Sequence, residues 1–314
     1  MSGFYCDYQE VVLDELKTIS SSNIEEQNYL NMLDHILKNG IKKEDRTGIG
    51  TLSSFGHNLR FNLSNGIPLL TTKKIWLKGV FHELQWILSG STNNKVLKEK
   101  GVHIWDLNST REFLDSRGLE HYPEDDIGAT YGYACRHFGH SDYKGCQYDY
   151  QGMGFDQLEY VINELKTNPS NRRILINLWD GSMMDKVALM PCFMTYNFYV
   201  DTQNKKLNLL GYIRSSDSFL GLPWNIAYAS LMVYLLCNLE GIDLQPGELL
   251  INTCDQHIYL NHIDAIKQQL TRTPKAFPKL EILRKVNKIE DFEWKDVVLK
   301  DYDAMPNIKA DMAI

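Results

Sequence analysis

Cys192 is the residue of this sequence whose type and surroundings best suit covalent chemistry. It directly follows Pro191, whose ring fixes the backbone angle φ, and it precedes a strand predicted at residues 193–200. A neighbouring predicted strand, residues 207–213, leads into Arg214. A guanidinium beside a thiol lowers the pKa of the thiol and raises the thiolate fraction. This pairing indicates a nucleophile, whereas a lone cysteine is more often an inert buried side chain.

Arginines in polar turns are a second group suited to chemistry. They are Arg46, Arg172, Arg173 and Arg214. Guanidinium forks bind phosphate oxygens in pairs, so four arginines at the junctions of loops and strands suit a phosphate monoester. Each arginine alone is also typical of a solvated surface, and their spacing is only a weak signal.

Three other side chains are candidates for hydrogen bonding or proton transfer. His257 and Tyr259 lie close together in DQHIYLNH, where we predict the start of a helix. The pair suits a sugar hydroxyl, and a purely structural role is equally compatible. Glu83 lies within an apolar helix face, where a carboxylate without a partner is costly. Such a group usually has a raised pKa and often transfers protons.

The elements that must position these residues follow from hydrophobic spacing. Helices are predicted at residues 28–37, 78–88, 155–166, 224–239 and 257–270. Strands are predicted at residues 51–61, 173–179, 193–200, 207–213, 277–283 and 294–299. Residues 109–155 are expected to form loops, with a short strand or turn near Tyr131. No internal repeat or linker divides the chain, which predicts a flexible extension at residues 1–25 and one α+β domain at residues 26–314.

Composition excludes several classes of protein. The 314 residues are 43% hydrophobic and 23% charged, which is typical of a globular chain. A net charge of −7 argues against a nucleic-acid partner. Six cysteines without metal-ligand spacing argue against a metal site and a disulfide-rich fold. The N-terminus lacks a signal-peptide pattern, and no apolar run reaches the ~20 residues of a membrane helix, so we expect a cytoplasmic location without a membrane partner.

Taken in order, the motifs of this chain resemble those of the thymidylate synthase family, from about residue 29 to 314. The motifs are DRTGIGT (45–51), ELQWILSGSTN (83–93), HIWD (103–106), SNRR (170–173), MPC (190–192), RSSDSFLGLPWN (214–225), DQHIYLNH (255–262) and MPNIKADMAI (305–314). Segments 109–126 and 140–155 resemble insertions of the eukaryotic-length branch. The resemblance implies a large mixed or antiparallel sheet with flanking helices, and a homodimer formed across that sheet.

The same resemblance implies the substrate dUMP, the co-substrate 5,10-methylenetetrahydrofolate, no metal, and roles for individual residues. Cys192 matches the nucleophile that adds to C6 of the pyrimidine, Glu83 the general acid–base group, and Tyr131 a proton-relay or positioning phenol. Residues matching substrate ligands are Arg46, Arg172, Arg173, Arg214, Ser215, Asp217, Asn225, His257 and Tyr259, with Arg172 and Arg173 reaching the site of the other subunit. Residues matching the folate site are Ile104, Trp105, Asn108, Asp217, Gly221, Trp224, Met312 and Ala313. Arg214 and Asp217 also count among the catalytic residues.

Several positions depart from the family pattern. The family usually has His after the nucleophile and Gln before the RS pair, where this chain has Phe193 and Ile213. It has Gln-Trp after the tyrosine motif, where this chain has Ala134 and Cys135, and His before the tail proline, where this chain has Met305. If Phe193 and Ile213 line the site, its water network must differ. A dUMP hydroxymethylase, in which water captures the methylene intermediate, is therefore an alternative to the synthase, since members of that branch also lack the His after the nucleophile and the Gln before the RS pair.

Retention of the DMAI tail favours the synthase, because the family's tail closes over the site and excludes water. Asn225 keeps the expected base as uracil, since cytosine-specific relatives carry an acid there. A catalytically impaired nucleotide- or RNA-binding homologue is a remote third reading. It is disfavoured because Cys192, Glu83, Asn225 and the arginines are all present.

Overall fold

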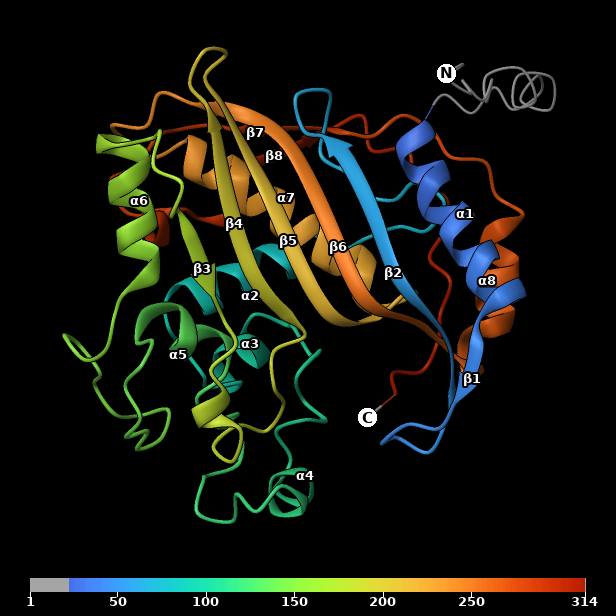
Figure 1. Cartoon of the computed structure of the whole chain (residues 1–314), viewed down its shortest axis with the longest axis horizontal. Helices are drawn as coiled ribbons and strands as arrows, with labels where there is room; N and C mark the ends of the chain where they lie inside the picture. Colours follow the sequence, from blue (N-terminus) through green and yellow to red (C-terminus); the bar gives the residue numbers. More distant parts are fainter. Residues whose placement is uncertain (1–22, 314) are drawn as a thin grey trace, which may run out of the picture.

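A six-stranded sheet forms the centre of the molecule (Figure 1). The computed structural model describes residues 23–313, so residues 1–22 of the predicted extension lie outside the described residues. The strands, in spatial order, are β1 (Ile41–Lys43), β2 (Thr51–Asn62), β6 (Gln245–Tyr259), β5 (Lys206–Asp217), β4 (Phe193–Asp201) and β3 (Leu175–Asn177). Only β5 and β6 pair in parallel. The prediction of an α+β domain with a large mixed sheet is confirmed.

The topology of this sheet gathers the predicted chemistry at one edge. β4 begins beside the end of β5, with Phe193 opposite Ile213, because these strands are antiparallel. β6 runs parallel to β5, so Asp217 and His257 lie side by side where both strands near their ends. The residues just before β4 and at the ends of β5 and β6 therefore come together.

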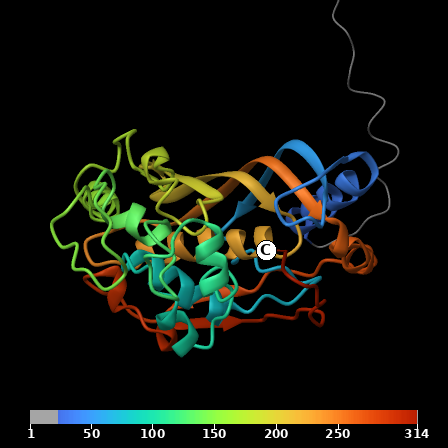
Figure 2. The same ribbon diagram turned by 90° about the horizontal axis from the view of Figure 1, so that it is seen from below.

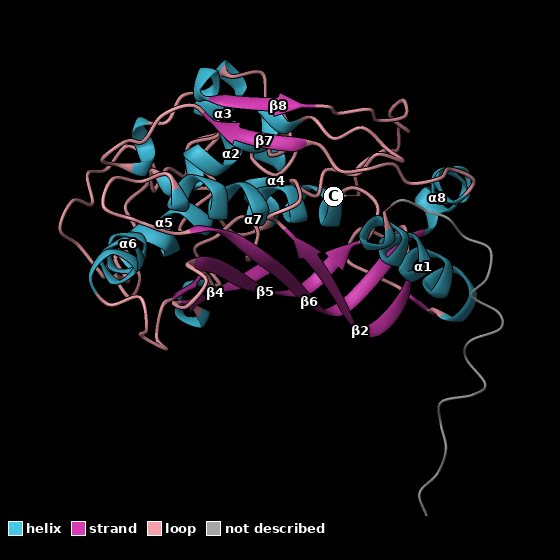
Figure 3. Cartoon of the chain, turned by 90° about the horizontal axis from the view of Figure 1, so that it is seen from above, coloured by secondary structure: helices cyan, strands magenta, loops and turns pink. Residues whose placement is uncertain are grey.

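Helices cover one face of the sheet, as the end-on views show (Figures 2 and 3). The helices are α1 (Ile24–Asn39), α2 (Leu77–Leu88), α3 (Lys95–Glu99), α4 (Arg111–Ser116), α5 (Tyr131–Arg136), α6 (Gln157–Thr167), α7 (Gly221–Cys237) and α8 (Ile263–Leu270). Helix α7 is buried on nearly all sides, as a helix that is apolar all round must be. A two-stranded sheet, β7 (Lys279–Ile282) with β8 (Val297–Lys300), lies beyond the helices (Figure 3).

Several segments differ from their predictions. The helix predicted at 257–270 begins only at α8, because residues up to Tyr259 continue β6 and pair with Thr51 of β2. β6 itself was missed. The short strand or turn expected near Tyr131 is helix α5, and the expected loop region 109–155 also contains α4. Helix α4 had local signals that were not used, since the Thr110 side chain accepts from the backbone N–H of Phe113 at its start.

Helix α7 begins three residues before the predicted start at residue 224. The carboxylate of Asp217 explains this, since it accepts hydrogen bonds from the backbone N–H groups of Phe219, Leu220 and Gly221 at 2.9, 3.2 and 3.2 Å. A carboxylate at a helix N-terminus satisfies free N–H groups and is favoured by the helix dipole. Pro223 fits in the first turn, where its missing N–H is not needed.

In the part of the chain that the structure describes, no helix is both long and apolar enough to span a bilayer. The same residues contain no group of three or more His, Cys, Asp or Glu side chains placed to hold a metal ion.

Candidate active site

A cavity of about 450 Å³ at the edge where β4, β5 and β6 meet brings most of the predicted site residues together. The predicted residues that line it are Arg46, Glu83, Ile104, Trp105, Asn108, Cys192, Arg214, Ser215, Asp217, His257, Tyr259, Met312 and Ala313. Two larger hollows, of about 890 and 990 Å³, contain neither Cys192 nor Glu83. Chemistry rather than size therefore identifies the site.

The remaining predicted residues lie outside this lining. Arg172 and Arg173 are exposed, and Arg172 borders a hollow on the outer face of the sheet. Tyr131 lies behind Cys192, whose backbone N–H donates to the Tyr131 hydroxyl at 2.8 Å. Gly221, Trp224 and Asn225 form the first turn of α7, and of these Trp224 reaches the cavity wall through a hydrogen bond to Glu83.

Arg214 holds the segment that carries Cys192. Its guanidinium donates to the carbonyl oxygens of Pro191 and Met190, both at 3.0 Å, and its Nη2 lies 3.8 Å from the sulfur of Cys192. Its backbone N–H also donates to the Cys192 carbonyl at 3.0 Å. The arginine predicted to lie beside the thiol is therefore there, and it fixes the backbone as well.

The pKa of Cys192 nevertheless lies above the usual range of a thiol. Burial raises it, and this effect outweighs the lowering by Arg214 and Arg46. The expectation that the neighbouring arginine lowers the pKa of Cys192 below its ordinary value is thus wrong for the protein without ligand. Sequence reasoning could place the guanidinium but not the amount of water removed from the sulfur.

Glu83 is buried, with 7% of its surface exposed, and burial raises its pKa, as expected for a carboxylate in an apolar helix face. The indole N–H groups of Trp105 and Trp224 donate to its two oxygens at 2.9 and 2.5 Å and act in the opposite direction. The carboxylate therefore has a fixed orientation within the wall of the cavity.

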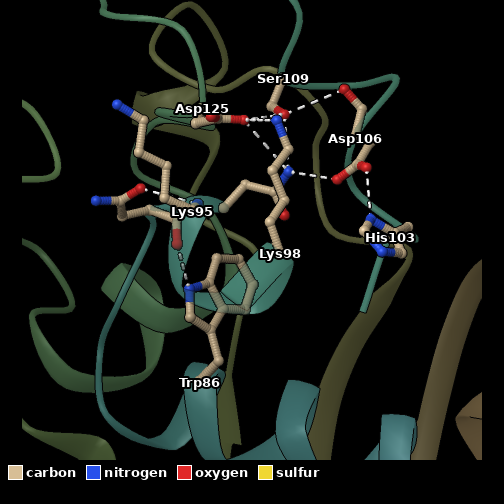
Figure 4. Close-up of polar contacts among 9 residues, drawn as sticks. Trp86, Lys95, Lys98, His103, Asp106, Ser109 and Asp125 are labelled. Carbon is tan, nitrogen blue, oxygen red and sulfur yellow. Dashed lines mark hydrogen bonds and ion pairs between the residues drawn. The ribbon is translucent and has the colours of Figure 1, made fainter. Parts of the chain in front are cut away.

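The turn at residues 103–109, which carries Ile104, Trp105 and Asn108, is held by side-chain hydrogen bonds (Figure 4). The amide of Asn94 donates to Asp106 Oδ1 and Ser109 Oγ at 3.0 and 2.9 Å. His103 Nδ1 lies 2.8 Å from the other oxygen of Asp106. The turn belongs to no helix or strand, and these polar side chains help to fix its shape.

Asp125, which is not part of the turn at 103–109, also holds it in place. Its Oδ1 accepts from Ser109 Oγ at 3.0 Å and lies 2.5 Å from Lys98 Nζ (Figure 4). Helix α2 is joined to the same region, because the indole of Trp86 donates to the carbonyl of Asn93 at 2.9 Å. The turn and the helix that carries Glu83 are therefore parts of one hydrogen-bonded unit.

Asp45 shapes the loop that presents Arg46, and sequence reasoning missed it as a lining residue. Its carboxylate accepts from the hydroxyl of Thr47 at 2.7 Å and from the backbone N–H of Gly50 at 2.8 Å. Gly50 has φ of +81°, a conformation that glycine adopts without strain. The sequence contained a signal for this turn, since Asp45 is followed by Thr47 and Gly48, and Asp, Thr and Gly are typical of turns.

Asp255 and Lys43, also missed, lie beside His257. The carboxylate of Asp255 accepts from Lys43 Nζ at 3.1 Å and from Ser53 Oγ at 2.9 Å, and it lies 3.2 Å from His257 Nδ1. The hydrogen bond with His257 is the largest cause of the lowered pKa of Asp255. Because Nδ1 of His257 faces this carboxylate, its Nε2 is the nitrogen left for a ligand.

The C-terminal tail is attached to the folded chain at several points. The backbone N–H of Met305 donates to the Thr71 carbonyl at 2.7 Å, and Nε2 of His262 lies 2.8 Å from the Asp311 carbonyl. These contacts bring Met312 and Ala313 to the cavity. His262 also lies 3.6 Å from Asp217, through Nδ1.

The other variant positions belong to the core and not to the cavity lining. Phe193 and Ile213 are 2% and 0% exposed, and the Phe193 ring stacks on Tyr196 at a centroid distance of 4.1 Å. The two residues lie opposite each other in the β4–β5 ladder, and neither lines the cavity. Ala134 and Cys135 are buried on α5, and burial raises the pKa of Cys135 to about 12.

The cavity thus brings together a thiol, a buried carboxylate and two guanidinium groups, a set typical of an enzyme site. The family model described as thymidylate synthase matches residues 27–314. The chain is 47% identical to human thymidylate synthase over 92% of this chain and 91% of that protein, and 45% identical to the thymidylate synthase of Herpesvirus ateles over 92% and 98%. This chain belongs to the thymidylate synthase family.

Some relatives are longer. The bifunctional dihydrofolate reductase-thymidylate synthase of Leishmania major is 46% identical over 93% of this chain, and the chain spans 56% of the length of that protein.

Proposed function

We propose that this chain transfers a one-carbon unit from 5,10-methylenetetrahydrofolate to C5 of dUMP, giving dTMP and dihydrofolate. One observation carries the proposal. Cys192, Glu83, Arg214 and His257 line one cavity, together with most of the other residues that match the family's substrate and folate ligands. A thiol, a buried carboxylate and guanidinium groups are the types that this chemistry needs.

The nucleotide is bound through its phosphate and its sugar in this proposal. Arg46, Arg214 and Ser215 hold the phosphate from one chain, and Asn225 and Asp217 contact the pyrimidine. His257 and Tyr259 hold the 3′-hydroxyl, for which their position at the end of β6, with ring centroids 5.1 Å apart, is suitable.

Cys192 acts by adding its sulfur to C6 of the uracil ring, which makes C5 nucleophilic. Arg214 favours the thiolate at its distance of 3.8 Å. Glu83 moves protons to and from the base, and Tyr131 supports it as a positioning phenol. After C5 has received its new carbon, the C5 proton and the folate nitrogen leave, and the carbon–sulfur bond at C6 breaks when hydride from the folate reaches the methylene carbon.

The residues present fit a folate. Ile104, Trp105, Leu189 and Met312 give the cavity an apolar part beside the polar part that contains Arg46 and Arg214. Such a surface suits a flat pterin, and Asn108, Asp217, Gly221, Trp224 and Ala313 complete the proposed site. The folate supplies the methylene carbon and the hydride that reduces it to a methyl group. No metal is part of the proposal.

The partner subunit is a second copy of this chain that packs across the sheet. The outer face of the sheet supports this, since it exposes Tyr199 and Tyr212 by 69% and 36%. Arg172 and Arg173 lie on the exposed side and are proposed to reach the phosphate of the partner's site. We place the protein in the cytoplasm, as expected from its cysteine usage.

The hydroxymethylase alternative is not part of this proposal. One ground for it was that Phe193 and Ile213 line the site, and both are core residues. The product analysis below decides the other ground, that hydroxymethylases share the absence of His and Gln at these positions. Met312 and Ala313 line the cavity, where a docked tail excludes water from the reaction.

The test is an analysis of the products. The protein is incubated with dUMP and 5,10-methylenetetrahydrofolate, the nucleotide is examined by mass spectrometry, and dihydrofolate is followed by absorbance. Methylated nucleotide with equimolar dihydrofolate is expected. A CH2OH group on the nucleotide, together with tetrahydrofolate, would show that the protein is a hydroxymethylase and not a synthase. If the folded protein gave no product, both activities would be excluded.

A further inference from the structure

Both oxygens of the Glu83 carboxylate accept an indole N–H. Trp105 Nε1 donates to Oε1 at 2.9 Å, and Trp224 Nε1 donates to Oε2 at 2.5 Å. The two indoles come from separate parts of the chain, the turn at 103–109 and the first turn of α7. Glu83 therefore has its orientation determined from two sides.

Gly79 provides the room for the second indole. Gly79 and Glu83 are one turn apart on α2 and thus lie on the same face of that helix. A Cβ atom at Gly79 would lie 2.8 Å from Trp224 Cη2 and 2.4 Å from Trp76 Cε3, which is closer than van der Waals contact allows. The Trp224 ring therefore lies along α2, with its benzene edge over Gly79 and its N–H at Glu83.

We infer that Trp224 is a positioning residue for Glu83: its indole N–H holds one carboxylate oxygen and keeps the group oriented beside the cavity. This inference deepens the proposed function and rests on the proton-transfer role given there to Glu83. An indole N–H can only donate, so it stabilises the ionised carboxylate and offers nothing to the proton of a neutral carboxyl group.

The direction of the effect follows from the opposing contributions at this site. Burial raises the pKa of Glu83, and the hydrogen bonds of Trp224 and Trp105 lower it. The phenols of Tyr131 and Tyr228, on α5 and α7, interact with Glu83, and burial raises the pKa of both, so both are neutral near pH 7. Arg46, Arg214, Asp217 and His257 also line the cavity beside Glu83. Cys192 lies across the same cavity. Removing the Trp224 N–H should raise the pKa of Glu83.

The first experiment compares Trp224→Phe with the wild-type protein by infrared difference spectroscopy across a pH titration. The C=O stretch of protonated Glu83 is assigned by its absence in Glu83→Gln. We expect the midpoint to rise by about one pH unit, as the loss of one hydrogen bond to a charged group implies. Trp294→Phe is the matched control, because Trp294 packs on Phe81, away from Glu83, and its midpoint should equal that of the wild type.

The second variant preserves ring size. Trp224 replaced by β-(3-benzothienyl)alanine keeps the bicyclic ring over Gly79 and lacks only the N–H, so it should shift the midpoint as Trp224→Phe does even if the smaller ring disturbs packing. In turnover, the acidic limb of the kcat profile should move to higher pH in both variants.

An unchanged infrared midpoint in the benzothienyl variant would overturn the inference, and so would a raised KM for folate with an unchanged pH profile, which is the result of simple ring stacking. The infrared midpoint needs no turnover. Failure of the wild-type protein to convert dUMP would therefore count against the proposed function, while the midpoint would still decide the role of Trp224.

Discussion

The cavity has two walls that are built differently. The strand wall consists of residues at the joined ends of β4, β5 and β6, namely Cys192, Arg214, Ser215, Asp217, His257 and Tyr259. The loop wall consists of Ile104, Trp105 and Asn108 from the turn at 103–109, and Met312 and Ala313 from the tail. The backbone ladder of the sheet holds most of the first wall, with the Arg214 side chain holding the segment that carries Cys192. The second wall lies outside the sheet and is held by side-chain hydrogen bonds and by backbone hydrogen bonds of its turns.

The difference separates two tasks. A bond between sulfur and carbon needs its partners placed to within a fraction of an ångström, which paired strands provide. Admitting and covering a large co-substrate needs segments that can be displaced, which loops and a terminal tail provide. Changes in the strand wall should therefore reduce kcat, and changes in the loop wall should alter folate binding and the access of water.

The largest effect is expected at the sulfur. Cys192→Ser should lower kcat on the order of 10³-fold or more, because a hydroxyl is a much weaker nucleophile than a thiolate. Steady-state turnover measures this, with circular dichroism to verify folding. Cys146→Ser, in a partly exposed loop, is the control and should keep its turnover. Comparable turnover in both variants would remove Cys192 from the mechanism.

Truncation before Met312 should have the next largest effect. The loop wall loses its tail residues, so kcat should fall by about 100-fold and part of the product should carry CH2OH, because water gains access to the methylene intermediate. Mass spectrometry of the nucleotide measures the ratio. Equal loss of kcat without hydroxymethyl product would mean that the tail positions ligands but does not exclude water.

Asp106→Ala tests the loop wall at a residue outside the cavity. It removes the acceptor for Asn94 and His103, so the turn at 103–109 should loosen and the KM for folate should rise by about 10-fold, with the KM for dUMP unchanged. Asp115→Ala, a surface carboxylate paired with Arg111, is the control. An equal rise in both KM values would show that the two walls are not separable.

Ile213→Gln tests a residue beside the strand wall that faces the core. A polar side chain buried there without a partner should destabilise the fold by about 1–3 kcal/mol, while the methyl product remains the only one. Denaturant unfolding and product analysis measure the two effects. Appearance of hydroxymethyl product would show that position 213 acts on the site after all.

The smallest effect concerns the ion pair that joins the walls. Burial lowers the pKa of His262, but Asp217 outweighs it and raises the pKa, and the pKa of Asp217 is lowered by His262 and backbone N–H groups despite its burial. The pair should therefore stabilise the fold between about pH 4 and 6.5. On the alkaline side its contribution is lost as pH rises through the raised pKa of His262. His262→Gln should flatten this decline in unfolding experiments, and an unchanged decline would exclude the pair as its cause.

Local patterns predicted much of the fold. Helices α2 and α6 and strands β4 and β5 lie close to their predicted ranges, since each has strong periodicity of its own. β6 was missed although its burial alternates over residues 247–254, because its polar end was read as the start of a helix. Its partners β2 and β5 precede it by many residues, and no local signal contains them.

The sequence by itself determined which chemical groups are available and in what order they occur: a thiol after proline, arginines before and after it, and an acid within an apolar helix. Only the tertiary structure decided what those groups do together. The net rise in the pKa of Cys192, the inward direction of Phe193 and the bond from Trp224 to Glu83, 141 residues apart, each depend on burial and on distant neighbours. Desolvation and non-local contacts are properties of the folded chain, and spacing along the sequence does not contain them.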